Sequence, residues 1–362
     1  MKIEKHGGNV YKYDGRVLDF SANLNPLGMP PEVKQAVLDG IDEYECYPDP
    51  DMRELKEAIC RRTGVSTKHI CCGNGGDDLI YRIVLAFRPK KALLVVPIFT
   101  EYEEALKLAE CQIDYWFLKE ENGFHLDDGI VGQIETGGYD MVILCSPNNP
   151  TGIPVEQKKI TSIIYACHCS GARMLIDECF MDFVLGEENY TVLPRIEALP
   201  NVIILKSFTK LFAMAGLRLG FCLCGSAEDA AAVNGCMQTW PVSTPAAKAG
   251  IAALSLTDLE DQTRVRVALE REKLISALLG LGFRTYDSQA NYIFFRSGEP
   301  LDEPLLEHSV LIRNCSNYRG LEDCPERGEY FYRIAVRTEE ENRYIIRALT
   351  EILSGEQNST QK

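Results

Sequence analysis

The sequence predicts an α/β protein: a large domain with a mostly parallel central sheet, plus a smaller α+β domain. Five short runs are almost wholly apolar, as strands buried on both faces of a parallel sheet require; they span residues 92–96, 141–145, 174–176, 202–205 and 219–222. The segments between these runs are long enough for crossover helices. After residue 255 the pattern changes to one long amphipathic segment and further short apolar runs, which indicates a second unit.

We expect four divisions of the chain. Residues 1–45 form an N-terminal arm and part of the small domain, and residues 46–245 form the large domain. Residues 246–354 form an interdomain helix and the small C-terminal domain, and the polar tail 355–362 is disordered. Within the small domain the pattern predicts a helix in 255–280, strands at 291–295, 310–312 and 330–336, and a closing helix at 339–353.

Composition narrows the class of protein. A chain of 362 residues that is 46% hydrophobic can bury a large core, yet no run of about 18 apolar residues occurs. The start lacks the apolar centre of a signal peptide, so we expect a cytoplasmic protein with no membrane partner. A net charge of -15 disfavours binding to nucleic acid. Because no secretion signal is found, we expect the 14 cysteines to be reduced thiols rather than a disulfide framework, and because they lack paired CxxC spacing we expect no metal site.

The segment after the run 202–205 carries the strongest chemical signal. Ser207, Thr209 and Lys210 are followed by Arg218 between Gly216 and Gly220. Two hydroxyls, an amine and a guanidinium are the groups needed to hold a phosphorylated aldehyde cofactor while bonding to it, which points to pyridoxal phosphate. A single lysine is usually a solvated surface residue, and an arginine can be a plain ion-pair partner. Beside a cationic ring and phosphate donors, however, the pKa of the Lys210 amine would be lowered.

Other chemically useful residues follow the same series of strands, where functional groups of open α/β sheets gather. Gly75 and Gly76, which precede the first of those strands, lead into an expected helix whose amino end favours a phosphate, although an ordinary loop has the same composition. Phe99 can stack on a flat ring or belong to the core. Asn149 lies in a turn stiffened by two prolines and can donate to a ring oxygen. Asp177 is either a cap or the carboxylate that keeps a pyridine nitrogen protonated.

Taken in order, these motifs resemble the fold type I pyridoxal-phosphate enzymes, close to the histidinol-phosphate aminotransferases. The resemblance extends over nearly the whole chain and rests on Tyr47-Pro48-Asp49, Gly73-Asn74-Gly75, Pro147 to Gly152, Asp177-Glu178, Ser207 to Lys210 and Gly216 to Gly220. It implies the fold type I transferase-like fold and a homodimer with shared active sites.

The resemblance also implies roles for single residues. Lys210 would bond to the cofactor aldehyde, Asp177 would contact the pyridine nitrogen and Asn149 the ring hydroxyl. Phe99 would stack on the ring. The phosphate contacts implied are those of Gly75, Gly76, Ser207, Thr209 and Arg218, with Tyr47 reaching the cofactor phosphate of a neighbouring subunit.

Segments outside the cofactor motifs resemble a narrower group, the L-threonine-O-3-phosphate decarboxylases of cobalamin biosynthesis. These segments are residues 6–9, 20–28, 312–321 and 332–337. Phe180 supports the same group. Three residues after Asp177, related aminotransferases carry a tyrosine, whereas this chain has a phenylalanine, as those decarboxylases do. The resemblance implies that Arg333 holds the substrate carboxylate, while Arg313, Arg337 and His6 surround the substrate phosphate; which group binds which anion stays open. Asn23 and Asn149 complete the expected substrate-binding set.

A purely structural interpretation of Arg333 and Arg337 is that one strand presents both side chains to solvent, since a spacing of four residues keeps them on the same side of the strand.

The expected reaction is decarboxylation of L-threonine O-3-phosphate to (R)-1-aminopropan-2-yl phosphate, with Lys210 as a candidate acid. The α-carbon bond that stands perpendicular to the cofactor ring breaks, so an out-of-plane carboxylate gives carbon dioxide and an out-of-plane hydrogen gives transamination. The alternatives are a histidinol-phosphate-type aminotransferase and a decarboxylase of L-serine O-phosphate, whose missing methyl is worth only about 1–3 kcal/mol. An alternative outside the enzymes is a non-catalytic protein that keeps the fold as a cofactor-binding scaffold or as an acidic interaction protein.

Overall fold

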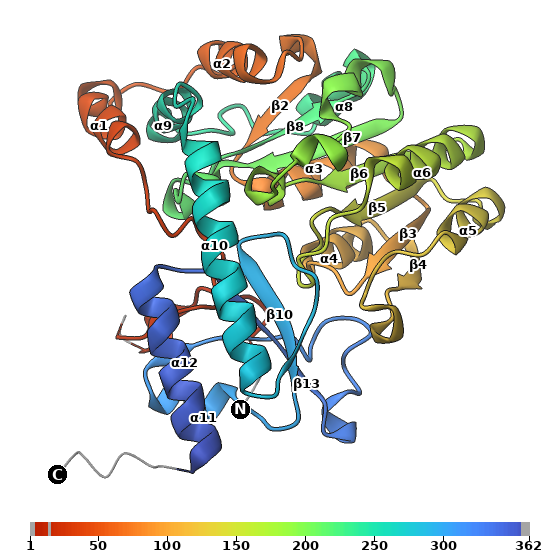
Figure 1. The fold of residues 1–362 in the computed structure, drawn as a ribbon. Coiled ribbons are helices and arrows are strands. Elements are labelled where there is room, and N and C mark those ends of the chain that lie inside the picture. The colour runs from red at the N-terminus through yellow and green to blue at the C-terminus, as the bar shows by residue number, and fades with distance from the viewer. Residues whose placement is uncertain (1–3, 14–15, 356–362) are drawn as a thin grey trace.

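A seven-stranded sheet forms the centre of the large domain (Figure 1). The computed structural model describes residues 4–13 and 16–355. The strand order is β2-β8-β7-β6-β5-β3-β4, and only β8 runs opposite to its neighbours among the pairs described. The strands are β2 (Ile70–Gly73), β3 (Lys91–Val96), β4 (Gln112–Phe117), β5 (Met141–Cys145), β6 (Arg173–Asp177), β7 (Val202–Ser207) and β8 (Gly220–Cys224).

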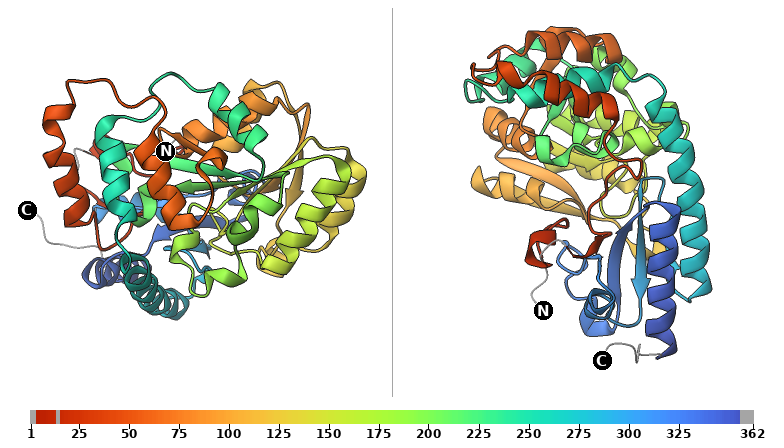
Figure 2. Two further views of the ribbon diagram at one scale, coloured as in Figure 1. Left: turned by 90° about the horizontal axis from the view of Figure 1, so that it is seen from above. Right: turned by 90° about the vertical axis from the view of Figure 1, so that its left-hand side faces the viewer.

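All five apolar runs became strands of this sheet, which confirms the predicted mostly parallel core. β5, β6 and β7 are buried at nearly every position, because helices lie on both faces of the sheet (Figure 2). Two strands of this seven-stranded sheet, β2 and β4, had not been predicted. β2 is only four residues long and ends at a glycine-rich turn. β4 is an edge strand with half-buried side chains, so it lacks the continuous apolar run that marks the central strands.

The helices of the large domain are, in chain order, α1 (Pro31–Asp39), α2 (Arg53–Thr63), α3 (Gly76–Phe87), α4 (Glu101–Leu108), α5 (Gly129–Gly137), α6 (Gln157–Ser170), α7 (Phe208–Leu211), α8 (Ala227–Gly235) and α9 (Thr244–Leu254). Of these, α3, α4, α5 and α6 occupy crossover segments between parallel strands, as the spacing of the strands predicted, whereas the segment between β6 and β7 forms only short 3-10 helices. α3 follows β2 directly and α4 follows β3 within a few residues. Both helices therefore begin at the edge of the sheet where the parallel strands end.

A second, antiparallel sheet of order β12-β13-β10-β9 forms the small lobe. Its strands are β9 (Arg284–Thr285), β10 (Tyr292–Ser297), β12 (Arg313–Asn314) and β13 (Tyr330–Ala335). The long helix α10 (Leu259–Gly280) runs from the large domain down to this sheet and packs beside α12 (Glu339–Ser354), with α11 (Asp302–Glu307) below (Figures 1 and 2). The helix predicted in 255–280 thus begins four residues later than the start of that range.

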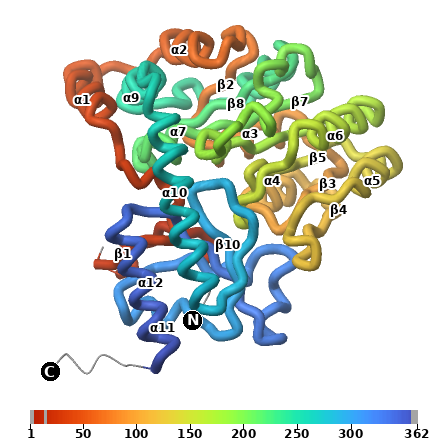
Figure 3. Tube along the Cα trace, viewed as in Figure 1, coloured from red at the N-terminus to blue at the C-terminus, as the bar shows by residue number. Residues whose placement is uncertain are grey.

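The N-terminal arm lies against the small lobe, although the chain then enters the large domain (Figure 3). β1 (Leu18–Asp19) pairs in parallel with β11 (Val310–Leu311). Gly355 ends α12 in a left-handed conformation, and the rest of the tail predicted as disordered, 356–362, lies outside the described residues. No described helix has the length and apolar character needed to cross a membrane.

All 14 cysteines are free thiols, as their lack of a disulfide framework had predicted. Three of them, from two separate segments of the sequence, come together: the sulfur atoms of Cys71, Cys222 and Cys224 lie within 4.8 Å of one another. β2 and β8 pair in register here, with Cys71 opposite Cys222.

Candidate active site

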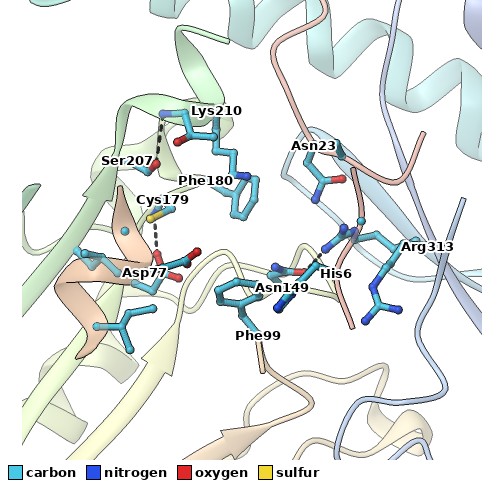
Figure 4. A pocket seen from close by; sticks show the side chains of 18 of the residues that line it. His6, Asn23, Asp77, Phe99, Asn149, Cys179, Phe180, Ser207, Lys210 and Arg313 are labelled. Carbon is cyan, nitrogen blue, oxygen red and sulfur yellow. Dashed lines mark hydrogen bonds between the residues drawn. The ribbon is translucent and has the colours of Figure 1, made fainter. Parts of the chain in front are cut away.

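A cavity of about 340 Å³ lies where the carboxyl ends of β5, β6 and β7 meet the start of α3, the N-terminal arm and strands β12 and β13 (Figure 4). It gathers residues from both ends of the sequence. Of the residues predicted as functional, those that line it are His6, Asn23, Gly76, Phe99, Asn149, Asp177, Ser207, Thr209, Lys210, Arg218, Arg313 and Arg333. Phe180 lines it as well.

Lys210 lies in the short helix α7, immediately after β7. Ser207 caps this helix, because its Oγ accepts a hydrogen bond from the amide of Thr209 at 3.2 Å. Burial is the largest influence on the Lys210 amine and lowers its pKa, and the charges of Arg333 and Arg218 act in the same direction. A lowered pKa leaves more of the amine neutral and able to bond to a carbonyl carbon.

Asp177 ends β6 as a buried carboxylate held by neutral donors. Its Oδ2 accepts from the hydroxyl of Tyr102 at 2.7 Å, and its Oδ1 accepts from the amide of Cys179 at 2.9 Å. Within residues 4–13 and 16–355, no lysine, arginine or histidine forms an ion pair with Asp177. A buried anion that still lacks a cation suits a ligand with a protonated ring nitrogen.

The start of α3 and Arg218 form a cradle for an anion. Gly75 has φ +88°, and a Cβ at that position would lie 2.5 Å from Nη2 of Arg218. Gly220 approaches the same turn, since a Cβ there would lie 2.8 Å from the carbonyl carbon of Gly75. The amides at the amino end of α3, the hydroxyls of Ser207 and Thr209, and the guanidinium together fit a phosphate.

Phe99 and Asn149 supply the remaining predicted contacts of a planar cofactor. Phe99 lines the cavity and meets Tyr102 edge-on, with ring centroids 6.4 Å apart. The side-chain oxygen of Asn149 accepts from Nη1 of Arg333. This bond orients the Asn149 amide, so that its NH₂ group is the half available to donate to a ring oxygen.

The opposite wall of the cavity is cationic. Arg333 is 5% exposed, donates from Nη2 to the carbonyl of Ser21 at 2.7 Å, and its Nε has no partner among the described residues. Arg313 is 2% exposed and lies over Tyr318, with its guanidinium carbon 5.0 Å from the ring centroid. The buried Oδ1 of Asn23 also has no partner in the described part of the chain. The unpaired Nε of Arg333 suits an anionic group of a ligand, whereas the unpaired oxygen of Asn23 is an acceptor and suits a group that donates a hydrogen bond.

Three predicted site residues do not line the cavity: Gly75, which adjoins the lining residue Arg218, and Arg337 and Tyr47, which make other contacts. Arg337 donates to the carbonyl of Asp19 at 2.8 Å and to Glu341 at 2.6 Å, so its amino groups are used in joining the arm to α12. Tyr47 is 78% exposed and stacks on Trp240, with ring centroids 4.2 Å apart.

The sequence did not lead us to two residues that hydrogen-bond side chains of the site without having been predicted as part of it. Tyr102 holds Asp177, and Glu101 holds His6 at 2.8 Å. Both follow Phe99 in one short segment, and this closeness in sequence was the only available signal. Asp77 also lines the cavity, and burial raises the pKa of its carboxyl.

Known proteins share this architecture. The family model described as aminotransferase class I and II matches residues 15–349. The chain is 35% identical over 363 residues to the threonine-phosphate decarboxylase of Salmonella typhimurium, covering 97% of each protein. It is 34% identical over 344 residues to a histidinol-phosphate aminotransferase of Desulfitobacterium hafniense, covering 92% of this chain and 91% of that one. The solved histidinol-phosphate aminotransferase from Clostridium acetobutylicum matches with a TM-score of 0.85 at 28% identity, covering 94% of this chain and 100% of that one, which confirms the predicted fold class.

Proposed function

Because this chain belongs to the family of class I and II aminotransferases, we propose that it uses pyridoxal 5'-phosphate to decarboxylate L-threonine O-3-phosphate to (R)-1-aminopropan-2-yl phosphate in cobalamin biosynthesis. One observation carries the proposal: a single cavity joins a wall suited to the cofactor with a wall holding two buried arginines and a histidine. The nearly full-length similarity to a threonine-phosphate decarboxylase supports the same choice.

The wall formed by the large domain would hold the cofactor. Lys210 would bond to its aldehyde, Asp177 would pair with the ring nitrogen, and Asn149 would donate to the ring hydroxyl. Phe99 would cover the ring face. The phosphate would be held by Gly75, Gly76, Ser207, Thr209 and Arg218, the groups that form the cradle at α3.

The opposite wall would hold the substrate by its two anionic groups. Arg333 lies next to Asn149 and would take the carboxylate, while Arg313 and His6 would take the phosphate. Asn23 would add a polar contact. Arg337 does not line the cavity and donates to Asp19 and Glu341, so the proposed phosphate site consists of Arg313 and His6.

Orientation by these groups would select the bond that breaks. When bound, the cofactor supplies an electron sink for the α-carbon bond that stands perpendicular to its ring. Arg333 would orient the substrate carboxylate so that its bond to the α-carbon is the one that breaks, with carbon dioxide as the product. Lys210 would then deliver a proton to the α-carbon. Phe180 lies 5.6 Å from the Lys210 amine, measured to the ring centroid, and offers no hydroxyl that could hold the amine elsewhere.

The assembly and domain limits are part of the same proposal. We propose a homodimer with shared active sites, in which Tyr47 reaches the cofactor phosphate of the neighbouring subunit; its exposed side chain supports this role. We keep the division into 1–45, 46–245 and 246–354, supported by the pairing of β1 with β11 in the small lobe. We also propose a cytoplasmic location, and the net charge of -15 argues against nucleic-acid partners.

Three substrates tested in parallel decide the reaction. The holoenzyme is mixed with phosphothreonine, phosphoserine or histidinol phosphate, and carbon dioxide release and the cofactor spectrum are recorded together. The proposal expects carbon dioxide from phosphothreonine at a higher kcat/KM than from phosphoserine. Conversion of the cofactor to its amine form by histidinol phosphate, without carbon dioxide from the other two, would establish the aminotransferase instead.

A further inference from the structure

A short part of the N-terminal arm bridges the two walls of the cavity. His6 and Gly7 line the cavity, and Lys5 and His6 contact Glu101 in the first turn of α4. On the other side, Arg313 donates to the carbonyl of Lys5 at 2.8 Å, and Asn317 donates to the carbonyl of Glu4 at 3.2 Å. The arm is therefore tied to the large domain by side chains and to the small lobe by its backbone.

Glu101 is the tie to the large domain. Its Oε1 accepts from Nε2 of His6 at 2.8 Å and from Nζ of Lys5 at 2.9 Å, while its Oε2 accepts from the hydroxyl of Tyr81 at 2.6 Å. Burial, the largest single influence, raises the pKa of Glu101, but the hydrogen bonds from Tyr81 and Lys5 and the charges of Lys5 and His6 outweigh it and lower the pKa. The group is thus a carboxylate anion, which can only accept hydrogen bonds.

This geometry constrains the proton state of His6. Because Glu101 only accepts, Nε2 of His6 must carry a proton. In the neutral ring the other nitrogen, Nδ1, is then an acceptor that repels a phosphate oxygen. In the imidazolium form both nitrogens donate, and the Glu101 carboxylate stabilises that charge.

We propose that Glu101 is a positioning residue whose carboxylate orients the His6 ring to donate a hydrogen bond to a substrate phosphate, and thereby makes the enzyme select an amino acid that carries a phosphate. This inference rests on the proposed function, since it assigns His6 to the substrate phosphate. Glu101 is not among the residues that line the cavity. It acts through His6, whose ring also packs against Phe99 with centroids 5.4 Å apart.

The neighbouring Glu104 provides a matched control. It lies on the same helix as Glu101, and its carboxylate is 3.8 Å from the Lys5 amine, farther than that of Glu101. No bond between Glu104 and His6 occurs among the described contacts. We compare Glu101→Gln and Glu104→Gln as holoenzymes, measuring kcat and KM for phosphothreonine and the Kd of inorganic phosphate by calorimetry. Glu101→Gln should raise both KM and the phosphate Kd about tenfold or more while kcat changes little, because it removes binding of the phosphate and leaves the reacting centre intact. Glu104→Gln should match the parent in all three.

A double-mutant cycle separates positioning from a general structural role. If Glu101 acts through His6, adding Glu101→Gln to His6→Ala causes almost no further loss of phosphate affinity. Equal losses in both backgrounds would overturn the inference, and so would an unchanged phosphate Kd in Glu101→Gln. Tyr81→Phe serves if Glu101→Gln does not fold: it removes one donor to Glu101 and should weaken phosphate binding about threefold, and no change would count against the inference.

The two proposals fail in different ways. If the parent enzyme releases no carbon dioxide from phosphothreonine, the proposed reaction is wrong, yet the phosphate Kd values still test Glu101. If carbon dioxide is released and Glu101→Gln binds phosphate like the parent, the reaction stands and the role of Glu101 is wrong.

Discussion

Replacing Gly75 with alanine tests the cradle at the start of α3. Gly75 has φ 88° and ψ 174°, a conformation that is essentially restricted to glycine and costs other residues about 1–3 kcal/mol. The new Cβ would also lie 2.5 Å from Nη2 of Arg218, so the guanidinium must move away. The strain should lower the stability of the cofactor-free protein, whereas displacement of Arg218 should lower the affinity for the cofactor.

The loss of affinity can be worked out from the contact that is displaced. A hydrogen bond to a charged group contributes about 1.5–3 kcal/mol, which corresponds to roughly a 10- to 150-fold increase in the cofactor Kd. Absorbance titration of the cofactor-free protein with pyridoxal 5'-phosphate measures this Kd, and urea unfolding measures the strain. Gly216→Ala is the matched control, since a Cβ there meets no atom within 4 Å. A Gly75→Ala protein that binds the cofactor as tightly as the Gly216→Ala protein would refute the assignment of Arg218 to the phosphate.

Three further changes probe the groups behind and within the site. Burial raises the pKa of Glu178 from 4.5 to about 7, so ionisation of this group lowers the stability of the folded protein as pH rises across this window. In urea unfolding, the stability of Glu178→Gln relative to the parent should therefore increase by about 3 kcal/mol between pH 4.5 and 7. A stability difference that stays constant over this pH range would contradict this. Tyr102→Phe removes the 2.7 Å bond to Asp177 and should lower the unfolding free energy of the cofactor-free protein by about 1–3 kcal/mol, while an unchanged urea midpoint would show that this bond contributes nothing. Lys210→Ala should abolish carbon dioxide release and leave no cofactor-derived mass on the protein after borohydride reduction; a retained adduct would place the bond on another lysine.

The central strands could be predicted because their signal is local. β5 and β7 are continuous apolar runs whose composition reports burial on both faces. β2 and β4 escaped prediction for the same reason, since a four-residue strand and a half-buried edge strand carry little local signal. The first residue of the predicted tail, Gly355, instead ends α12, because a glycine accepts the left-handed conformation that stops a helix.

The residues of the candidate site also differ in whether a local sequence pattern identifies them. Lys210, Asp177 and Arg218 were identified because each stands in a short motif. Asp177 and Lys210 lie at the ends of β6 and β7, and Arg218 lies just before β8, which starts at the same edge of the sheet because it runs antiparallel to β7. The different outcomes for Arg333 and Arg337 could not be predicted, since both belong to one motif four residues apart. Arg333 faces Asn149 in the cavity, whereas Arg337 is held by Glu341.

By itself, the sequence determined the type of chemistry this chain can support, because the groups that would hold and bond the cofactor lie in short motifs whose spacing constrains their geometry. Only the tertiary structure decided which side chains complete the substrate wall. His6 meets Glu101 across 95 positions of sequence, and Arg313 reaches the backbone of Lys5 across 308. Contacts over such separations depend on how the arm and the small lobe pack onto the large domain, and no local pattern of residues encodes that packing.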